Sequence, residues 1–162
     1  MRFQWIAYDA AYYDIVESWM DEETKRFTGC DEGWFDYVDD MMHDEISRPG
    51  ENFWCKVILD KEVPFAVMAL FLTDEKMLCV TEYVVAPEFR GRGLGAAVLR
   101  ELLCCEQEII GREFLSAGAV IFTNNLASQR TFLKTGFRFE SAHPDGDAWY
   151  YRFDKNRDKS NG

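Results

Sequence analysis

A glycine-rich segment near the middle of the chain has the composition of an anion-binding loop. It reads Arg90-Gly91-Arg92-Gly93-Leu94-Gly95 and follows an apolar run that ends at Pro87. Glycines allow the backbone to approach a ligand closely, and main-chain amides at the start of a helix favour negative charge. The two arginines add positive charge to a chain whose net charge is −11. We therefore predict a pyrophosphate cradle between a strand and a helix; a tight turn with surface arginines is the simpler interpretation.

Two other known loops bind similar groups. Gly91-x-Gly93-x-x-Ala96 matches the dinucleotide fingerprint, but that motif expects an acidic residue about 20 positions later, at the end of the next strand. Here Asn124-Asn125 follow that strand. A triphosphate loop would need a Gly-Lys-Ser or Gly-Lys-Thr sequence, which the chain lacks. A nucleotide-binding oxidoreductase is therefore the less favoured alternative.

The composition narrows the classes of function. A net charge of −11 argues against a nucleic-acid partner, which needs a basic surface, and favours cationic partners or simple solubility. The five cysteines include no Cys-x-x-Cys pair and there are only two histidines, so we expect free thiols and no metal. No apolar run reaches the roughly 18 residues of a membrane helix, and no segment follows the pattern of a secretory signal. We expect a cytoplasmic protein with no membrane partner.

Hydrophobic periodicity predicts one domain over residues 1–154 and a polar tail over residues 155–162. The predicted strands cover residues 3–7, 53–59, 64–72, 77–86, 117–123, 137–142 and 149–153. Helices are predicted after Asp9 and after Asp31, and over residues 94–103 and 125–135. Short polar connections make the three central strands an antiparallel meander, whereas the crossover from 77–86 to 117–123 implies one parallel pair.

Two sequence blocks resemble those of the GNAT family of N-acetyltransferases. Arg90-x-x-Gly93-x-Gly95, after a strand ending Val84-Val85-Ala86-Pro87, looks like the acetyl-CoA motif of that family. Asn125-x-x-Ser128-x-x-x-Phe132-x-Lys134-x-Gly136-Phe137 resembles its second block. The resemblance covers residues 2–154 and is strongest to ribosomal-protein N-terminal and aminoglycoside acetyltransferases. It implies an α+β fold: a mostly antiparallel sheet of about seven strands, a V-shaped splay between strands four and five, and about four flanking helices.

The resemblance also implies acetyl-CoA as cofactor and assigns its contacts. Backbone groups of Val84 and Val85 would pair with the pantetheine arm, and amides from Arg90 to Gly95 would hold the pyrophosphate. Asn125 and Ser128 would lie along the other side of the cofactor. The backbone amide of Val85 or its neighbour would stabilise the oxyanion that forms on the thioester carbonyl.

The acid and base of the reaction are less well defined. Many members of the family carry a tyrosine as general acid at the position of Phe132, which has no proton to give and is interpreted as a core residue. Glu82 is the one charged residue in the run 77–86, and a charge in a central strand needs a role or a partner. Strict alternation places Glu82 on the face opposite Cys79, unless a bulge reverses the order. Glu82 is therefore a candidate base with an ion pair as the alternative, and Tyr83 is a weaker candidate.

The acceptor amine is predicted to be cationic. Eleven carboxylates lie in residues 17–45, in the part of the chain that resembles the acceptor wall of the family. Trp34, Asp36 and Asp40 are the candidate contacts, although a solvated acidic helix face would have the same pattern. The hypothesis is transfer of an acetyl group to a primary amine of a small molecule or peptide, by a monomer or a homodimer. A non-catalytic acyl-CoA-binding or sensing module of the same fold is the alternative.

Overall fold

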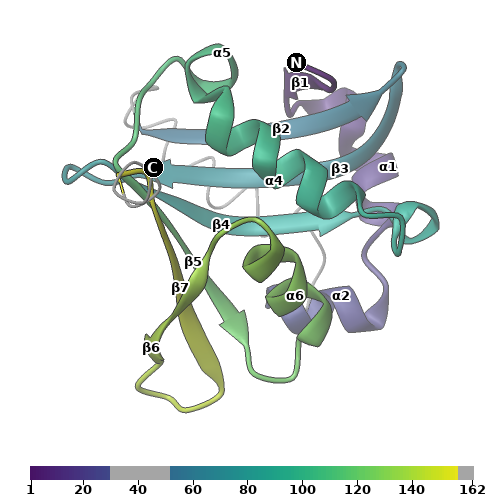
Figure 1. Cartoon of the computed structure of the whole chain (residues 1–162). Coiled ribbons are helices and arrows are strands. Elements are labelled where there is room, and N and C mark those ends of the chain that lie inside the picture. Colours follow the sequence, from purple (N-terminus) through teal and green to yellow (C-terminus); the bar gives the residue numbers. More distant parts are fainter. Residues whose placement is uncertain (30–51, 157–162) are drawn as a thin grey trace.

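Seven strands form one sheet in the part of the chain that the computed structural model describes, residues 1–29 and 52–156 (Figure 1). The strands are β1 (Gln4–Ala7), β2 (Phe53–Asp60), β3 (Val63–Leu72), β4 (Met77–Val85), β5 (Ser116–Phe122), β6 (Arg138–Ala142) and β7 (Ala148–Asp154). Their order across the sheet is β1-β2-β3-β4-β5-β7-β6. Every neighbouring pair is antiparallel except β4 and β5, which α4 (Leu94–Cys104) connects as a parallel crossover. The predicted α+β sheet with one parallel pair is confirmed.

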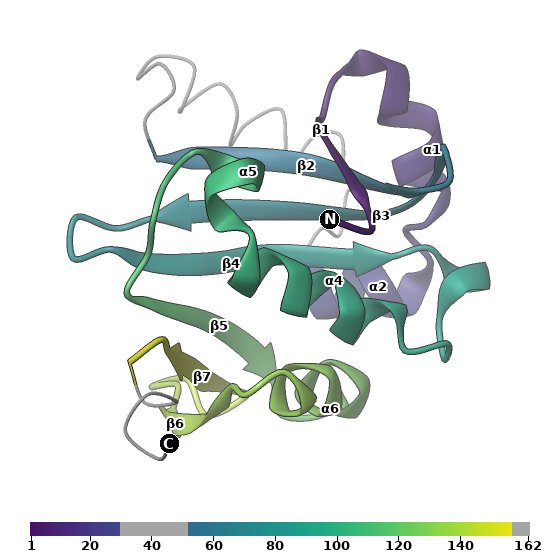
Figure 2. The ribbon, with the colours of Figure 1, turned by 45° about the horizontal axis from the view of Figure 1, so that its top comes forward.

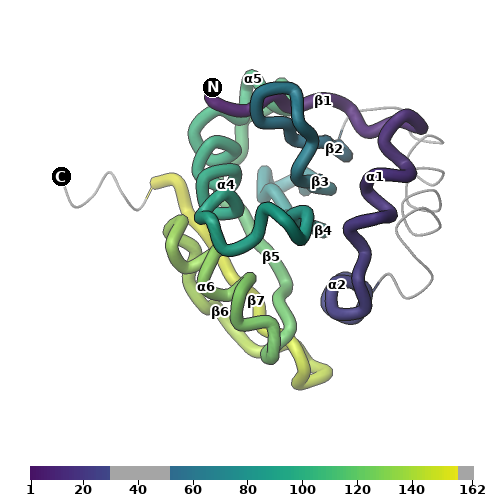
Figure 3. The backbone as a smooth tube through the Cα atoms, turned by 90° about the vertical axis from the view of Figure 1, so that its right-hand side faces the viewer, coloured from purple at the N-terminus to yellow at the C-terminus, as the bar shows by residue number. Residues whose placement is uncertain are grey.

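Helices cover both faces of this sheet, as Figure 3 shows. α4, α5 (Glu106–Ile110) and α6 (Leu126–Lys134) lie on one side, which we call the α4 face. α1 (Tyr13–Ser18) and α2 (Glu22–Thr28) lie on the other side, which we call the α2 face. Figure 2 shows α4 in front of β4, and α6 beside the end of β5.

Each face has its own hydrophobic core. On the α4 face, the buried side chains of Val98, Leu99 and Leu102 pack against apolar residues of β3, β4 and β5. On the α2 face, Val16 and Trp19 pack against apolar residues of β2 and β3. Full burial of one such side chain contributes about 1.5–3 kcal/mol. The sheet is therefore held from both sides, and the helix predicted over residues 94–103 is confirmed.

The N-terminal helical region is divided differently from the sequence prediction. Asp9 caps a short 3₁₀ helix, η1 (Ala10–Tyr12), which continues into α1. α2 was not predicted as a separate helix. It begins because the Asp21 carboxylate accepts a hydrogen bond from the Thr24 amide at 2.8 Å, which fixes a new N-cap. The periodicity also did not indicate α5, and the helix predicted after Asp31 lies outside the described residues.

The parallel pairing of β4 and β5 is short. It extends from Met77 to Val80 on β4 and ends at Ala119 on β5, and beyond these residues the two strands diverge (Figure 1). Next to the same point the register of β3 and β4 shifts, so that Thr81 is an extra residue opposite Ala69. A bulge of this kind bends its strand and increases the local twist. The predicted V-shaped opening is present, and its apex lies at Val80 and Ala119.

Candidate functional site

The loop between β4 and α4 contains the two glycines on which the predicted cradle depends. After a 3₁₀ turn, η2 (Pro87–Phe89), Gly91 has φ = 73° and Gly93 has φ = 74°, and Gly93 is the N-cap of α4. This left-handed conformation favours glycine. A Cβ atom at either position would meet nothing within 4 Å, so the space beside both glycines is open. The glycines therefore shape the backbone and leave room for a ligand.

The main-chain amides that follow are free to bind an anion. From Gly91 to Ala96 they donate to no backbone acceptor within residues 1–29 and 52–156, and the first bond of the helix runs from Ala97 N to Gly93 O at 3.2 Å. Free amides at a helix start carry the positive end of the helix dipole. The Arg90 amide differs, because it donates to the Pro87 carbonyl at 3.3 Å. The free donors thus begin one residue later than predicted.

The Arg90 side chain is directed to α2 and β4 instead of to the cradle. Its Nε donates to the Val85 carbonyl at 2.9 Å, and its two terminal nitrogens donate to Asp21 Oδ2 at 3.0 Å and to Thr24 Oγ1 at 2.8 Å. Hydrogen bonds from the Thr24 hydroxyl and amide, together with the Arg90 guanidinium, lower the pKa of Asp21 below its usual value. The prediction that both arginines add free charge to the cradle is wrong for Arg90.

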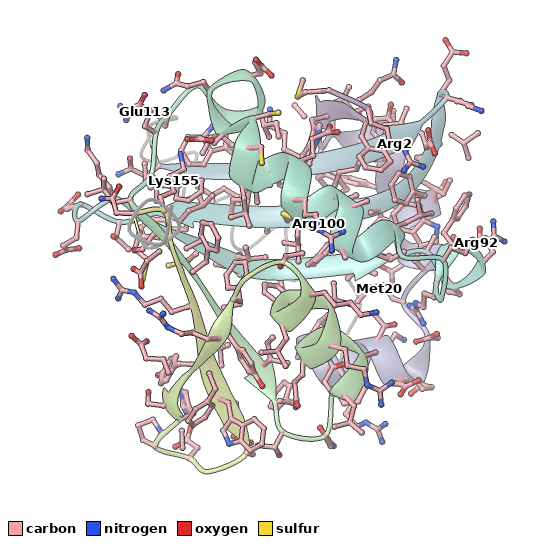
Figure 4. The ribbon with its side chains drawn as sticks, in the orientation of Figure 1. Arg2, Met20, Arg92, Arg100, Glu113 and Lys155 are labelled. Carbon is pink, nitrogen blue, oxygen red and sulfur yellow. The ribbon has the colours of Figure 1, made fainter. Side chains whose placement is uncertain are left out.

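Arg92 keeps an exposed position at the outer end of the loop (Figure 4). Its guanidinium carbon lies 5.5 Å from the centroid of the Phe89 ring, and it has no carboxylate partner among the described residues. Arg92 is therefore the arginine of this loop that can add charge beside the open glycines.

Gly95 and Tyr83 fasten the start of α4 to the sheet. The Tyr83 hydroxyl donates to the Gly95 carbonyl at 2.8 Å. A Cβ atom on Gly95 would lie 3.4 Å from Thr131 Cγ2 of α6, so Gly95 is also a packing residue. Leu94 is half-buried beside the α4-face core. Burial raises the pKa of Tyr83, and this hydroxyl lies on the α4 face as a structural donor.

The free edge of β4 exposes main-chain groups to the opening. Ala86 N donates to the Phe65 carbonyl at 2.7 Å, which makes these two residues a hydrogen-bonded pair. Because main-chain groups alternate along an antiparallel strand, those of Val85 and Tyr83 point away from β3 and toward β5. The groups of Val84 point toward β3, and its side chain is buried on the α2 face. The residues on the free edge are thus Tyr83 and Val85, not Val84 and Val85; Val85 contributes its amide, because its carbonyl already accepts from Arg90.

The Thr81 bulge decides the face on which Glu82 lies. The Thr81 hydroxyl donates to the Ala69 carbonyl at 3.1 Å, which holds the extra residue in place. Before the bulge Val80 packs on the α4 face; after it Val84 packs on the α2 face, and Glu82 shares that parity. Strict alternation is therefore wrong here, and Glu82 lies half-buried on the same face as Cys79.

α6 is attached to the end of β5 by side chains that the second sequence block contains. Asn125 Oδ1 accepts from the Ser128 amide at 3.2 Å and caps the helix. Gln129, which the sequence analysis missed, is buried, and its Nε2 donates to the Phe122 and Thr123 carbonyls at 3.0 and 2.9 Å. The two predicted cofactor contacts, Asn125 and Ser128, lie at the N-terminus of α6, and both are half-buried.

Phe132 is a core residue, as predicted. Its side chain is 4% exposed, and its ring meets that of Phe137 edge-on with centroids 4.9 Å apart. No proton can be donated from this position.

On the α2 face, the described residues line a larger and a smaller pocket. The larger has a volume of about 340 Å³, begins at the bulge and follows β4, β5 and β7. Its lining includes Cys79, Thr81, Gly118, Glu140, Tyr150 and Arg152. Burial raises the pKa of the Cys79 thiol. The smaller pocket, about 220 Å³, separates α2 from the end of β5 and is lined by Arg26, Phe27, Phe122, Thr123, Asn124 and Asp147.

The remaining predictions concern the acceptor contacts, metal ions and membranes. Trp34, Asp36 and Asp40, the predicted acceptor contacts, fall outside the described residues. Within the described ranges no group of three histidine, cysteine or acidic side chains could hold a metal ion. No helix in these ranges is both long and apolar enough to cross a membrane.

The sequence matches one family model over most of its length. Residues 12–137 match the acetyltransferase (GNAT) family. No curated protein sequence matches the chain.

Solved structures share the whole fold at low sequence identity. Spermidine N-acetyltransferase from Vibrio cholerae, in complex with CoA and spermine, has a TM-score of 0.78 at 11% identity over 96% of this chain and 97% of that one. AAC(6')-Ib in complex with paromomycin and acetyl-CoA has a TM-score of 0.76 at 14% identity, over 97% and 96%. The Campylobacter jejuni N-acetyltransferase PseH has a TM-score of 0.68 at 10% identity, over 96% and 99%. At these identities the likeness shows the fold and leaves the substrate open.

Proposed function

The chain belongs to the GNAT acetyltransferase family, and we propose that it transfers an acetyl group from acetyl-CoA to a primary amine by direct attack in a ternary complex. The observation that carries the proposal is the opening of the sheet beyond Val80 and Ala119, next to the free amides of residues 91–96. An extended arm can pair with an unpaired strand edge, and a pyrophosphate suits free amides at a helix start.

Acetyl-CoA is the acyl donor of this family and supplies a thioester carbonyl that an amine can attack. The amides of residues 91–96 and the exposed Arg92 would hold its pyrophosphate. The edge of β4 at Tyr83 and Val85 would orient the arm, and Asn125 and Ser128 would border its other side. One of the two edge amides would donate to the carbonyl oxygen, where negative charge develops during attack.

Glu82 is the proposed base. An ammonium must lose a proton before its nitrogen can attack, and a carboxylate can accept that proton directly or through water. Glu82 lies on the α2 face. It follows Thr81, and Thr81 lines the larger pocket. As the nitrogen–carbon bond forms, the carbon–sulfur bond breaks and CoA leaves as a thiolate; the nitrogen gives up its remaining extra proton to water, and the thiolate takes up a proton from water, so that the amide and the free thiol are both neutral.

Three other side chains fit the reaction less well. The Tyr83 hydroxyl is bound to the Gly95 carbonyl on the other face, so we leave Tyr83 out of the proton transfer and keep only its amide. Phe132 has no proton to donate. The raised pKa of Cys79 keeps its thiol protonated, which favours direct attack by the amine over an acetyl-cysteine route.

The acceptor is proposed to be cationic. The chain has a net charge of −11, and carboxylates stand on or beside the α2 face at Glu82, Glu140 and Asp147. Two structural neighbours are complexes with spermine and paromomycin, which are polyamines in the chemical sense. Trp34, Asp36 and Asp40 remain the contacts that the sequence predicts.

The test is release of the CoA thiol with a panel of amines: spermine, paromomycin, a basic peptide and a neutral primary amine. We expect turnover, a lower Michaelis constant for the cationic amines, and a difference that shrinks with salt, because charges are screened over about 8 Å at physiological ionic strength. A neutral best substrate without a salt effect would contradict the cationic acceptor alone.

Burial of Phe132 favours one alternative, a non-catalytic acyl-CoA-binding module. Such a module would bind CoA tightly and release no thiol with any amine. The same panel therefore separates the two functions.

A further inference from the structure

Arg90 joins two parts of the molecule that are far apart in the sequence. It belongs to the loop that starts the cradle, while Asp21 lies 69 residues earlier at the N-cap of α2. Its guanidinium donates to three different acceptors at once: a β4 carbonyl, a carboxylate and a hydroxyl. An arginine fork can satisfy several acceptors in one fixed orientation, whereas a lysine ammonium cannot imitate its shape.

The contact with α2 also has a fixed geometry. One oxygen of Asp21, Oδ1, caps α2 through the Thr24 amide, and the other, Oδ2, accepts from Arg90. Thr24 is buried, with 8% of its surface exposed, and its hydroxyl accepts a second bond from the same guanidinium. The first turn of α2 is therefore attached to the loop by two side chains that cannot move independently of each other.

α2 is at the same time a wall of the smaller pocket. Arg26 and Phe27, in its second turn, line that pocket opposite Phe122 and Asn124 at the end of β5. Because α2 has only seven residues, about two turns, we expect a change in the order of its first turn to reach these residues.

We infer that Arg90 is a positioning residue that couples occupancy of the cradle to the order of α2, the helical wall of the acceptor side. The inference rests on the proposed cofactor site. A pyrophosphate bound to residues 91–96 fixes the loop, the loop fixes the guanidinium, and the guanidinium fixes Asp21 and Thr24. Such coupling is reciprocal, so an acceptor that orders α2 would favour cofactor binding by the same factor.

Hydrogen exchange of the α2 amides, with and without CoA, tests the coupling without knowledge of the acceptor. In the parent chain we expect saturating CoA to slow exchange of residues 22–28 by at least about fivefold, a typical coupling of roughly 1 kcal/mol. The double variant Asp21→Asn/Thr24→Val leaves the loop intact and removes the hydroxyl that accepts from Arg90; the single amide oxygen of the asparagine caps α2, so that its NH2 group replaces the oxygen that accepted from Arg90. We expect its α2 to exchange at the same rate, within about twofold, with and without CoA. The CoA dissociation constant of this variant should stay within about threefold of the parent value, because α2 is ordered most of the time in both proteins.

The matched control is Glu22→Gln/Thr28→Val, which makes similar chemical changes on the same helix, at a carboxylate that pairs with Lys25 and at a hydroxyl that donates to the Thr24 carbonyl. It should keep the CoA-dependent protection. Equal protection of α2 by CoA in the Asp21→Asn/Thr24→Val variant would overturn the coupling through Arg90, as would a parent chain that binds CoA without any change in α2. A parent chain that binds no CoA would overturn the proposed function as well, so the two failures are distinguishable.

Discussion

The proposed cofactor side and the proposed acceptor side of the opening in the sheet are built by different means. On the cofactor side the groups that matter are main-chain amides: those of residues 91–96 at the start of α4, and those of Tyr83 and Val85 on the edge of β4. On the acceptor side they are side chains, above all Glu82 and the bonded pair of Asp21 and Arg90. A main-chain site tolerates most substitutions unless the shape of the backbone changes, whereas a side-chain site depends on single functional groups.

This difference implies that the largest loss from one isosteric change should occur on the acceptor side. Glu82→Gln keeps the size of the side chain and removes the proton acceptor. We expect kcat/KM for the amine to fall by about 100-fold, within the range of general-base catalysis, while the dissociation constant for CoA stays within about twofold. Stopped-flow or steady-state thiol release and calorimetry would measure the two quantities.

Glu113→Gln is the control for this variant. Glu113 lies far from the Arg92 loop in Figure 4, in the exposed connection before β5. It should behave like the parent. A loss below about threefold for Glu82→Gln would show that water and not this carboxylate accepts the proton.

On the cofactor side, the affinity for CoA should depend on the shape of the loop and on the open space beside its glycines. Gly93→Glu forces a side chain and a negative charge into the open space beside the free amides. We expect the affinity for CoA to fall at least about tenfold, or about 1.4 kcal/mol, as measured by calorimetry.

Gly111→Glu is the matched control. Gly111 has φ = 70° at the C-terminus of α5, and a Cβ atom there also meets nothing within 4 Å. Both variants carry the same strain of a left-handed residue, about 1–2 kcal/mol, so the stabilities should fall together while only Gly93→Glu loses CoA. Equal CoA affinity in the two folded variants would remove the cradle from the proposal.

Tyr83 contributes both a main-chain group and a side chain. Its amide lies on the edge of β4, and its hydroxyl holds the start of α4. Tyr83→Phe removes the bond to the Gly95 carbonyl, so we expect a loss of about 1 kcal/mol in unfolding free energy and about threefold weaker binding of CoA. The alkaline limb of the pH–rate profile should not move, because burial raises the pKa of this hydroxyl and it takes no part in proton transfer. A shifted alkaline limb would make Tyr83 an acid or base after all.

The difference between a main-chain site and a side-chain site also explains which features could be predicted from the sequence. The loop that we propose as the cradle could be located because glycines such as Gly91 and Gly93 favour left-handed turns, and the apolar spacing from Leu94 to Leu103 indicates the helix that follows. The central meander and the parallel pair followed from loop lengths and from the single crossover, whereas the place of β7 between β5 and β6 was not predicted.

The acceptor side was not predictable in this way. The face of Glu82 depends on one extra residue, Thr81, which only the pairing of β4 with β3 defines. The direction of Arg90 depends on a partner at Asp21, which no local spacing connects with it. α2 itself did have a local signal that was missed: Asp21 before two glutamates, Lys25-Arg26 near the end, and Gly29 just after it.

The smallest predicted effect tests whether charge contributes to the acceptor side. Asp21→Asn keeps an N-cap of similar quality and loses only the ion pair with Arg90, whose side chains are 37% and 45% exposed, so we expect under about 1 kcal/mol at pH 7 by urea unfolding. The pKa of Asp21 is lowered from 3.8 in the folded chain, first by the Thr24 hydroxyl and amide and then by Arg90. A lowered pKa means that the carboxylate stabilises the fold above pH 3.8 and that this contribution is lost as pH falls through the folded value. The difference between parent and variant should therefore vanish in acid, and shrink in high salt at pH 7. The main-chain cradle contains no titrating group in this range. A difference in stability that is the same at pH 7 and in acid would mean that the shape of the Asp21 side chain matters and its charge does not.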